Sequence, residues 1–212
     1  MASFDTSKTE AIVLSRRRWT NTANARGIQA GDKTLHFNKH ATRWLGVWLD
    51  SKLTLKEHHD TRLKIARNAQ NKLRRIVGQA GLSPENCRRV QAACVQAVAL
   101  FGSELWWKRD GTHGTQTRQE DIQKLVNQEA RNTTGTFRTT NQGALSMASG
   151  LRPAPAQLDN RLRRFARRLT SLPRGDQARN LVGADGTLEN CLLSFLGKWD
   201  RRKKPRFLQS TL

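Results

Sequence analysis

Two stretches of the sequence carry basic side chains dense enough to bind a polyanion. Residues 62–75 hold six lysines and arginines with no acid, and residues 161–168 hold five arginines. A guanidinium is a planar fork that pairs with two phosphate oxygens at once, so such clusters favour contact with polyphosphate over simple solvation. We expect the phosphate-contacting residues to be Arg62, Lys64, Arg67, Lys72, Arg74, Arg75, Arg161, Arg164, Arg167 and Arg168.

The charge of the whole chain agrees with this interpretation. The 212 residues include 38 Lys and Arg against 17 Asp and Glu, for a formal net charge of +21. A surplus of this size repels itself in a compact state unless a polyanion lies against it. We therefore expect RNA, DNA or an RNA–DNA hybrid as partner. Three alternatives stay open: an inert basic surface, helix faces paired with acids elsewhere, and a basic protein of chromatin or ribosome type.

Histidines and acids suggest a second kind of chemistry, a metal-dependent nuclease or a general base. The candidates are His58-His59-Asp60, with His36 and His40. Neighbouring residues on a helix point about 100° apart, and residues 58–60 fit neither HExxH nor HxxxH. No Asp-Asp pair occurs, and Glu120-Asp121 is expected to be surface charge on a helix. We therefore expect no metal and no cofactor in this chain.

The cysteines and tryptophans favour core packing. Cys87, Cys94 and Cys191 are odd in number and form no CxxC pair, so neither a disulfide framework nor a zinc site is indicated. Cys87 and Cys94 lie seven residues apart on a helical pattern, which predicts that both are buried. Most of the six tryptophans flank apolar segments and are expected in the core. Trp19 and Trp107, each beside a basic residue, are the alternative candidates for stacking on unpaired bases.

The apolar pattern divides the chain into three parts. Residues 1–54 predict short strands at 11–14, 34–37 and 44–49, which would form a small antiparallel unit. Residues 55–175 predict a helical bundle. Residues 176–212 predict a weakly structured basic segment, with one more helix around 192–196 and a basic tail from residue 198. The expected fold class is α+β, mainly α.

Apolar side chains at spacings of three and four outline the helices of the middle part. The first would bury Leu63, Ala66, Leu73, Ile76 and Val77 and end at Gly78 or Gly81. The second begins with Ser83 as N-cap and Pro84 in the first turn. Its predicted buried face is Val90, Ala93, Cys94, Ala97, Val98, Phe101 and Leu105. After a flexible connection at residues 110–115, further helices are predicted at 118–131, around 144–147, and from Pro153 to before Pro173.

No run of about 18 apolar residues occurs, and the first residues hold no apolar signal core. We therefore expect an intracellular protein, nuclear or cytoplasmic and not secreted, with no membrane partner.

Four stretches resemble, in order, the reverse transcriptases of non-LTR (LINE-like) retrotransposons of the fungal type. They lie at residues 4–15 (FDTSKTEAIVLS), at 44–54 (WLGVWLDSKLT), at 81–84 with 101–106 (GLSP and FGSELW), and at 135–154, which includes GTFRTT and GLRPA. Their order and spacing span most of residues 4–172. The resemblance implies the end of a polymerase palm followed by a thumb.

Several roles follow from this resemblance. It implies that Lys8 is a possible general acid in the parent enzyme, protonating the pyrophosphate that leaves. It also implies a primer grip, the hairpin that holds the 3′ end of the primer, at Trp44, Leu45, Gly46 and Val47. The helices that follow would correspond to the thumb, which packs along the template–primer duplex.

The departure from the family concerns catalysis. A polymerase uses two metal ions held by clustered carboxylates, and Mg²⁺ is therefore expected only for the complete enzyme. Because the Asp-Asp pair is missing, we expect this chain to start after the catalytic turn and to be inactive alone. The palm and fingers portion that it lacks is a further candidate partner.

Overall fold

The computed structural model describes residues 9–14, 27–30, 33–37, 40–108, 113–173, 175–176 and 178–179. The chain divides into two compact units, Met1–Asp159 and Asn160–Leu212. The helix predicted around residues 192–196, the basic tail, Lys8, Trp19 and Cys191 lie outside the described residues.

The strands of the first unit form two separate hairpins. Strand β1 (Ile28–Ala30) pairs antiparallel with β2 (Lys33–Leu35), and β3 (Ala41–Trp44) pairs antiparallel with β4 (Val47–Asp50). A single parallel bridge joins Ala11 to Phe37. The prediction of one strand over residues 44–49 was wrong, because Leu45 and Gly46 both take positive φ and turn the chain between β3 and β4.

Helix α2 (Lys56–Ala80) follows the second hairpin and is the longest helix of the described part of the chain. Asp50 fixes its start, since one carboxylate oxygen accepts from Leu55 N at 2.6 Å and the other from Thr54 N at 2.9 Å. Gly81 ends the helix in the left-handed conformation, which confirms the predicted C-cap. Of the predicted buried face, Leu63 and Ala66 are buried, but Ile76 is exposed.

Helix α3 (Pro84–Gln91) begins as predicted, with the Ser83 hydroxyl accepting a hydrogen bond from Asn86 N. The helix continues through a π-helical segment, η1 (Ala92–Gln96), into α4 (Ala97–Ala99). A short 3-10 turn, η2 (Ser103–Leu105), follows.

The π-helical segment changes which side chains face the core. A π-helix has more residues per turn than an α-helix, so residues spaced four apart stay on one side. The buried residues there are Cys87, Gln91, Val95 and Ala99. The predicted face was therefore wrong for four residues that are exposed: Ala93, Cys94, Ala97 and Phe101.

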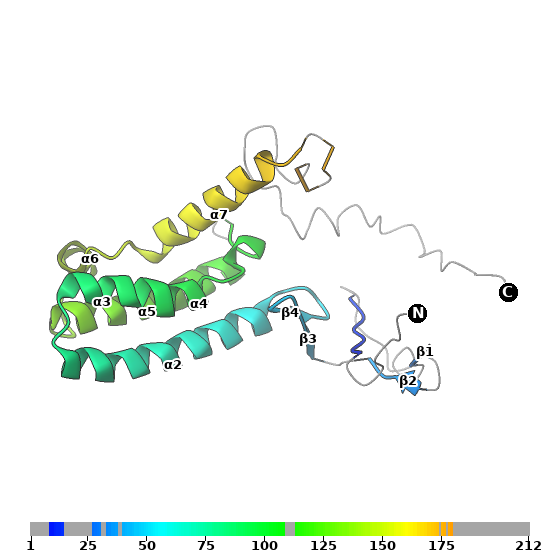
Figure 1. Ribbon diagram of the computed structural model, residues 1–212, viewed down its shortest axis with the longest axis horizontal. Coiled ribbons are helices and arrows are strands. Elements are labelled where there is room, and N and C mark those ends of the chain that lie inside the picture. Colours follow the sequence, from blue (N-terminus) through cyan, green and yellow to red (C-terminus); the bar gives the residue numbers. More distant parts are fainter. Residues whose placement is uncertain are drawn as a thin grey trace. The chain divides into compact units, whose positions relative to one another are not determined.

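Helix α5 (His113–Thr134) packs against α2 and α3, as Figure 1 shows. It begins at His113, so the flexible connection predicted for residues 110–115 was wrong for its last three residues. The inward position predicted for Ile122, Leu125 and Val126 is confirmed, since all three are buried. A cluster of buried side chains from α2, η1, α4 and α5 forms the core: Leu63, Ala66, Val95, Ala99 and Leu125.

Helices α6 (Gln142–Ser149) and α7 (Ala154–Thr170) complete the described helices. The Asn141 side chain caps α6 by accepting from Gly143 N at 2.8 Å, and Leu145 of this helix is buried. Helix α7 ends before Pro173, as predicted, and runs from the first unit into the second. The predicted fold class, α+β and mainly α, is confirmed.

Within the described residues, none of the helices combines the length and the apolar character that crossing a bilayer requires.

Candidate nucleic-acid interface

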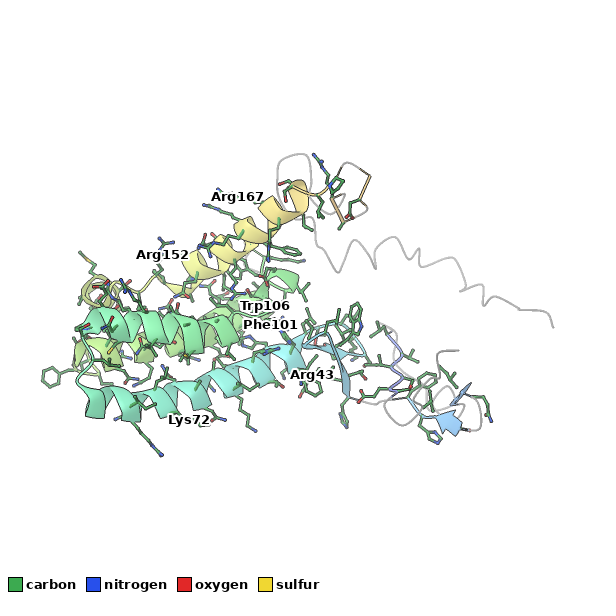
Figure 2. All side chains as sticks on the ribbon, viewed as in Figure 1. Arg43, Lys72, Phe101, Trp106, Arg152 and Arg167 are labelled. Carbon is green, nitrogen blue, oxygen red and sulfur yellow. The ribbon has the colours of Figure 1, made fainter. Side chains whose placement is uncertain are left out.

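The basic residues of α2 form an exposed face on the side away from its buried stripe. Lys64 and Arg75 lie eleven residues apart, which is close to three full turns, so they share one line along the helix. Lys72 projects from α2 away from α5 (Figure 2). Arg67 and Arg74, seven residues apart, lie together on one side of this line, and all five side chains are exposed. We call Lys64, Arg67, Lys72, Arg74 and Arg75 the α2 basic face.

The α2 basic face is not neutralised within the described part of the chain. The ion pairs found there are His59–Asp121, Arg89–Glu85 and Lys124–Asp121, and none involves this face. Five cations along about three turns of one helix, open to solvent, can track a row of phosphates.

Arg62 differs from the other five basic residues predicted for this helix. It is half-buried, and its Nη2 donates to the Gly46 carbonyl oxygen at 2.6 Å. Its guanidinium also lies 4.2 Å from the centre of the Phe101 ring. Burial lowers the pKa of Arg62, and repulsion from Arg43 lowers it further. Arg62 therefore holds the β3–β4 turn against α2.

His58 makes the second connection between the hairpin and the helices. Its side chain is 0% exposed, and its Nδ1 accepts a hydrogen bond from Trp48 N at 3.3 Å. Its Nε2 lies 2.9 Å from the Phe101 carbonyl oxygen, to which a proton on that nitrogen is donated. Both bonds need the neutral ring with its proton on Nε2, and burial lowers the pKa of His58.

His59, the next residue along α2, is also buried. Burial, followed by repulsion from Arg118, lowers its pKa to about 4. Its ring meets Trp106 edge to face, with the ring centres 5.3 Å apart. Arg118 also lies over Trp106 and donates to the Thr54 carbonyl oxygen at 2.6 Å. The two histidines are thus parts of the packing around the start of α2, rather than side chains open to a substrate.

In the second unit, the arginines of α7 are mostly exposed. Arg163, Arg164, Arg167 and Arg168 are exposed, and Arg168 lies 5.6 Å from the centre of the Phe165 ring. Arg161 is half-buried and takes part in an interaction within the structure. The exposed α7 arginines therefore make up a second basic surface.

Trp107 lies in the core, as expected for most of the tryptophans, whereas Trp44 does not. Trp107 is buried and its Nε1 donates to Asp159 Oδ1 at 2.9 Å, so it is not available for base stacking. Trp44, expected in the core, is 64% exposed. An adjacent basic residue made Trp107 a candidate for base stacking. Trp44 also has an adjacent basic residue, Arg43.

The residues of the predicted primer grip occupy the β3–β4 turn. Leu45 is 80% exposed at its tip, and Gly46 and Val47 are half-buried behind it. Exposed Arg43, which sequence reasoning missed, precedes the turn on β3 (Figure 2). The turn thus combines two exposed apolar side chains with a nearby cation.

No group of three or more metal-ligating side chains is found among the residues that the structure describes. Comparisons of the chain with protein-family models, with curated proteins and with solved structures gave no match.

Proposed function

We propose that this chain is a nucleic-acid-binding module that holds an RNA–DNA hybrid or a duplex without sequence preference. The α2 basic face carries this proposal, because five exposed cations without acidic partners in the described residues lie along one helix. Contacts from such side chains to phosphates position a duplex but do not read its bases. The protein would act inside the cell, in the nucleus or the cytoplasm.

We further propose that the module corresponds to the end of the palm and the thumb of a non-LTR retrotransposon reverse transcriptase. The order of elements supports this proposal, since a hairpin with an exposed turn is followed directly by a helical bundle. Mg²⁺ and clustered carboxylates would belong to the complete polymerase. The chain alone would bind template and primer without extending the primer.

Filter binding at low salt tests the proposed function. Purified protein should retain a labelled RNA–DNA hybrid on the filter. The fraction retained should not depend on the base sequence of the hybrid. If no hybrid is retained at 50 mM salt, the proposal fails. Equal or tighter retention of an acidic protein, such as a histone chaperone, would favour the alternative of a basic interaction protein of chromatin or ribosome type.

The α7 arginines allow a separate prediction. Changing Arg164 and Arg168 to glutamate should lower hybrid affinity about 10-fold or more, because two cations become repulsive anions at a phosphate-binding surface. Helix content measured by circular dichroism should stay the same, since both side chains are exposed.

The matched control for this prediction is Arg138→Glu with Arg152→Glu. Both of these arginines are exposed and lie outside the α2 and α7 surfaces, and the control lowers the net charge by the same amount. An equal loss of affinity in the two double variants would show that only total charge matters. A loss of helix content in the α7 variant would show that its arginines are structural.

A further inference from the structure

The β3–β4 turn holds an unfavourable backbone conformation at its most exposed residue. Leu45 has φ 47° and Gly46 has φ 84°, so both central residues of this two-residue turn are left-handed. Glycine adopts such angles readily, but a leucine there costs roughly 1–2 kcal/mol. Asn, Asp or Gly is the usual first residue of such a turn.

Two other leucines with positive φ show how the cost is offset elsewhere. Leu55 is only 2% exposed, and its N–H is bonded to Asp50. Leu53 is half-buried, and its N–H donates to the Asp50 carbonyl oxygen at 2.8 Å. Leu45 is 80% exposed, so burial within the described chain does not offset its strain. A strained and exposed apolar residue is a reason to look for a ligand.

The neighbours of Leu45 indicate the chemistry of that ligand. Trp44 precedes it at 64% exposure, and its indole presents a large flat apolar surface. Arg43 is exposed beside it, and Arg62 lies directly behind the turn, bonded to Gly46. Because Arg62 is engaged by Gly46 and Phe101, Arg43 is the cation of this turn that is open to a ligand. A flat apolar surface one residue from an exposed guanidinium complements a base joined to its phosphate.

The turn is also held firmly. The Arg62 side chain is hydrogen-bonded to Gly46 O. The buried His58 ring accepts a hydrogen bond from Trp48 N, four residues after Trp44. A tip fixed in this way loses little conformational freedom when it meets a ligand, and such preorganisation favours tight binding.

We propose that the Trp44–Leu45 tip stacks on an unpaired base, so that the protein prefers nucleic acid with an unstacked nucleotide to a continuous duplex. This inference rests on the proposed function. The α2 basic face would contact phosphates of any duplex, and the tip would add contact only where a base is free. The unpaired base need not stand at the end of a strand.

The test uses the full chain and three RNA–DNA hybrids of equal length. One hybrid is continuous, one carries a single bulged 2-aminopurine, and one carries a bulged abasic nucleotide. The abasic hybrid bends as easily as the 2-aminopurine hybrid but has no base to stack on. Fluorescence anisotropy gives the three dissociation constants. The hybrid with the bulged base should bind roughly 5-fold or more tighter than the other two. The 2-aminopurine emission should fall on binding, as expected for stacking on an indole.

Three variants assign that preference to the tip. Trp44→Ala should bring the affinity ratio of bulged to continuous hybrid to about 1 and abolish the quenching, whereas Trp44→Phe should keep most of the ratio. Leu45→Asn should lower the ratio and raise the thermal midpoint, because asparagine tolerates the left-handed conformation. A lower affinity ratio with a higher thermal midpoint would show that Leu45 contacts the ligand. A variant that had lost its fold would instead have a lower thermal midpoint.

Other outcomes overturn the inference. If wild-type protein binds continuous and bulged hybrids equally, the tip does not stack, although the proposed function stands. An equal preference for the base and abasic bulges would show that bending is recognised instead. If Trp44→Ala retains the ratio, another residue is responsible. Trp44-dependent binding to anionic phosphatidylserine vesicles, without a preference for the bulged base, would assign the tip to membranes. If none of the three hybrids binds, the inference and the proposed function both fail.

Discussion

Changing Lys64 and Arg75 to glutamate is expected to weaken hybrid binding roughly 30-fold at about 50 mM salt. Both side chains are exposed on one line of α2. A lysine or arginine contact to phosphate contributes on the order of 1 kcal/mol at a solvent-exposed surface, so two lost contacts give this factor. Fluorescence anisotropy with a labelled hybrid measures the change.

The control Arg138→Glu with Arg152→Glu lowers the net charge equally but leaves the α2 basic face intact. We expect it to weaken binding by less than about 3-fold, since long-range charge effects are screened within roughly 10 Å at 0.1 M salt. Equal losses in the two variants would contradict a localised interface. Circular dichroism should show the same helix content in both.

Changing Glu129 to glutamine is expected to stabilise the protein at pH 8 and to make it sensitive to acid. The Glu129 side chain is 0% exposed, and Oε2 accepts from Gln96 Nε2 at 2.8 Å. The other carboxylate oxygen, Oε1, is buried without a hydrogen-bond partner. Burial raises the pKa of Glu129 from 4.5 to about 7.

The raised pKa sets the direction of the effect of pH on stability. Between pH 4.5 and about 7 the folded state holds more protons at Glu129 than the unfolded state does, so stability falls as pH rises through this window. At about 1.4 kcal/mol per pH unit, the fall is about 3 kcal/mol, and it is complete above about pH 7. Glutamine carries no charge at any pH, so the variant avoids most of this loss at pH 8.

His59 changes the stability with pH in the direction opposite to that of Glu129. Its pKa is lowered from 6.5 to about 4, so the folded state resists protonation and stability falls as pH drops through this window. The two effects are similar in size and oppose each other between pH 4.5 and 6.5. Wild-type protein should therefore show little net change there from this pair, whereas Glu129→Gln should lose about 3 kcal/mol between pH 6.5 and 4.

Urea denaturation at half-unit steps from pH 4 to 8 measures both effects. Glu120→Gln is the matched control, because Glu120 is an exposed carboxylate on the same helix, and it should follow the wild-type curve. A Glu129→Gln variant that is less stable than wild type at pH 8, or that tracks wild type throughout, would contradict the assignment of a buried carboxylate.

The helix boundaries could be predicted where short-range chemistry decides them. Ser83 and Pro84 begin α3, and Gly81 ends α2, because a capping hydroxyl, a ring-fixed φ and a missing Cβ act within one turn. The α2 basic face could also be predicted, since its charges and the buried Leu63 and Ala66 follow the same helical period.

The buried face after residue 90 could not be predicted in the same way. The pattern was interpreted with 3.6 residues per turn, but the π-helical segment Ala92–Gln96 shifts the phase and leaves Cys94 exposed. Nothing in the local composition marks that segment, whose Val95 packs in one cluster with Ala99 of α4, Leu63 and Ala66 of α2 and Leu125 of α5.

The apolar pattern missed the hairpin turn, which only the family resemblance implied, and it missed the role of Arg62 for a related reason. Leucine at position 45 is an unusual residue for a left-handed turn position, so the run 44–49 resembled one strand. Arg62 belongs to a basic cluster in the sequence, yet its bond to Gly46 spans sixteen residues and depends on tertiary structure. Long-range contacts of this kind separate a positioning arginine from one that is free to bind phosphate.

The salt dependence of hybrid binding tests the central claim most directly. If six to eight phosphates are neutralised, the logarithm of the association constant should fall against the logarithm of salt concentration with a slope of roughly −4 to −7. Anisotropy titrations of wild-type protein between 50 and 200 mM salt give this slope. Binding that persists with a slope near zero, or no binding at 50 mM, would contradict the proposal that this chain holds nucleic acid through its basic helices.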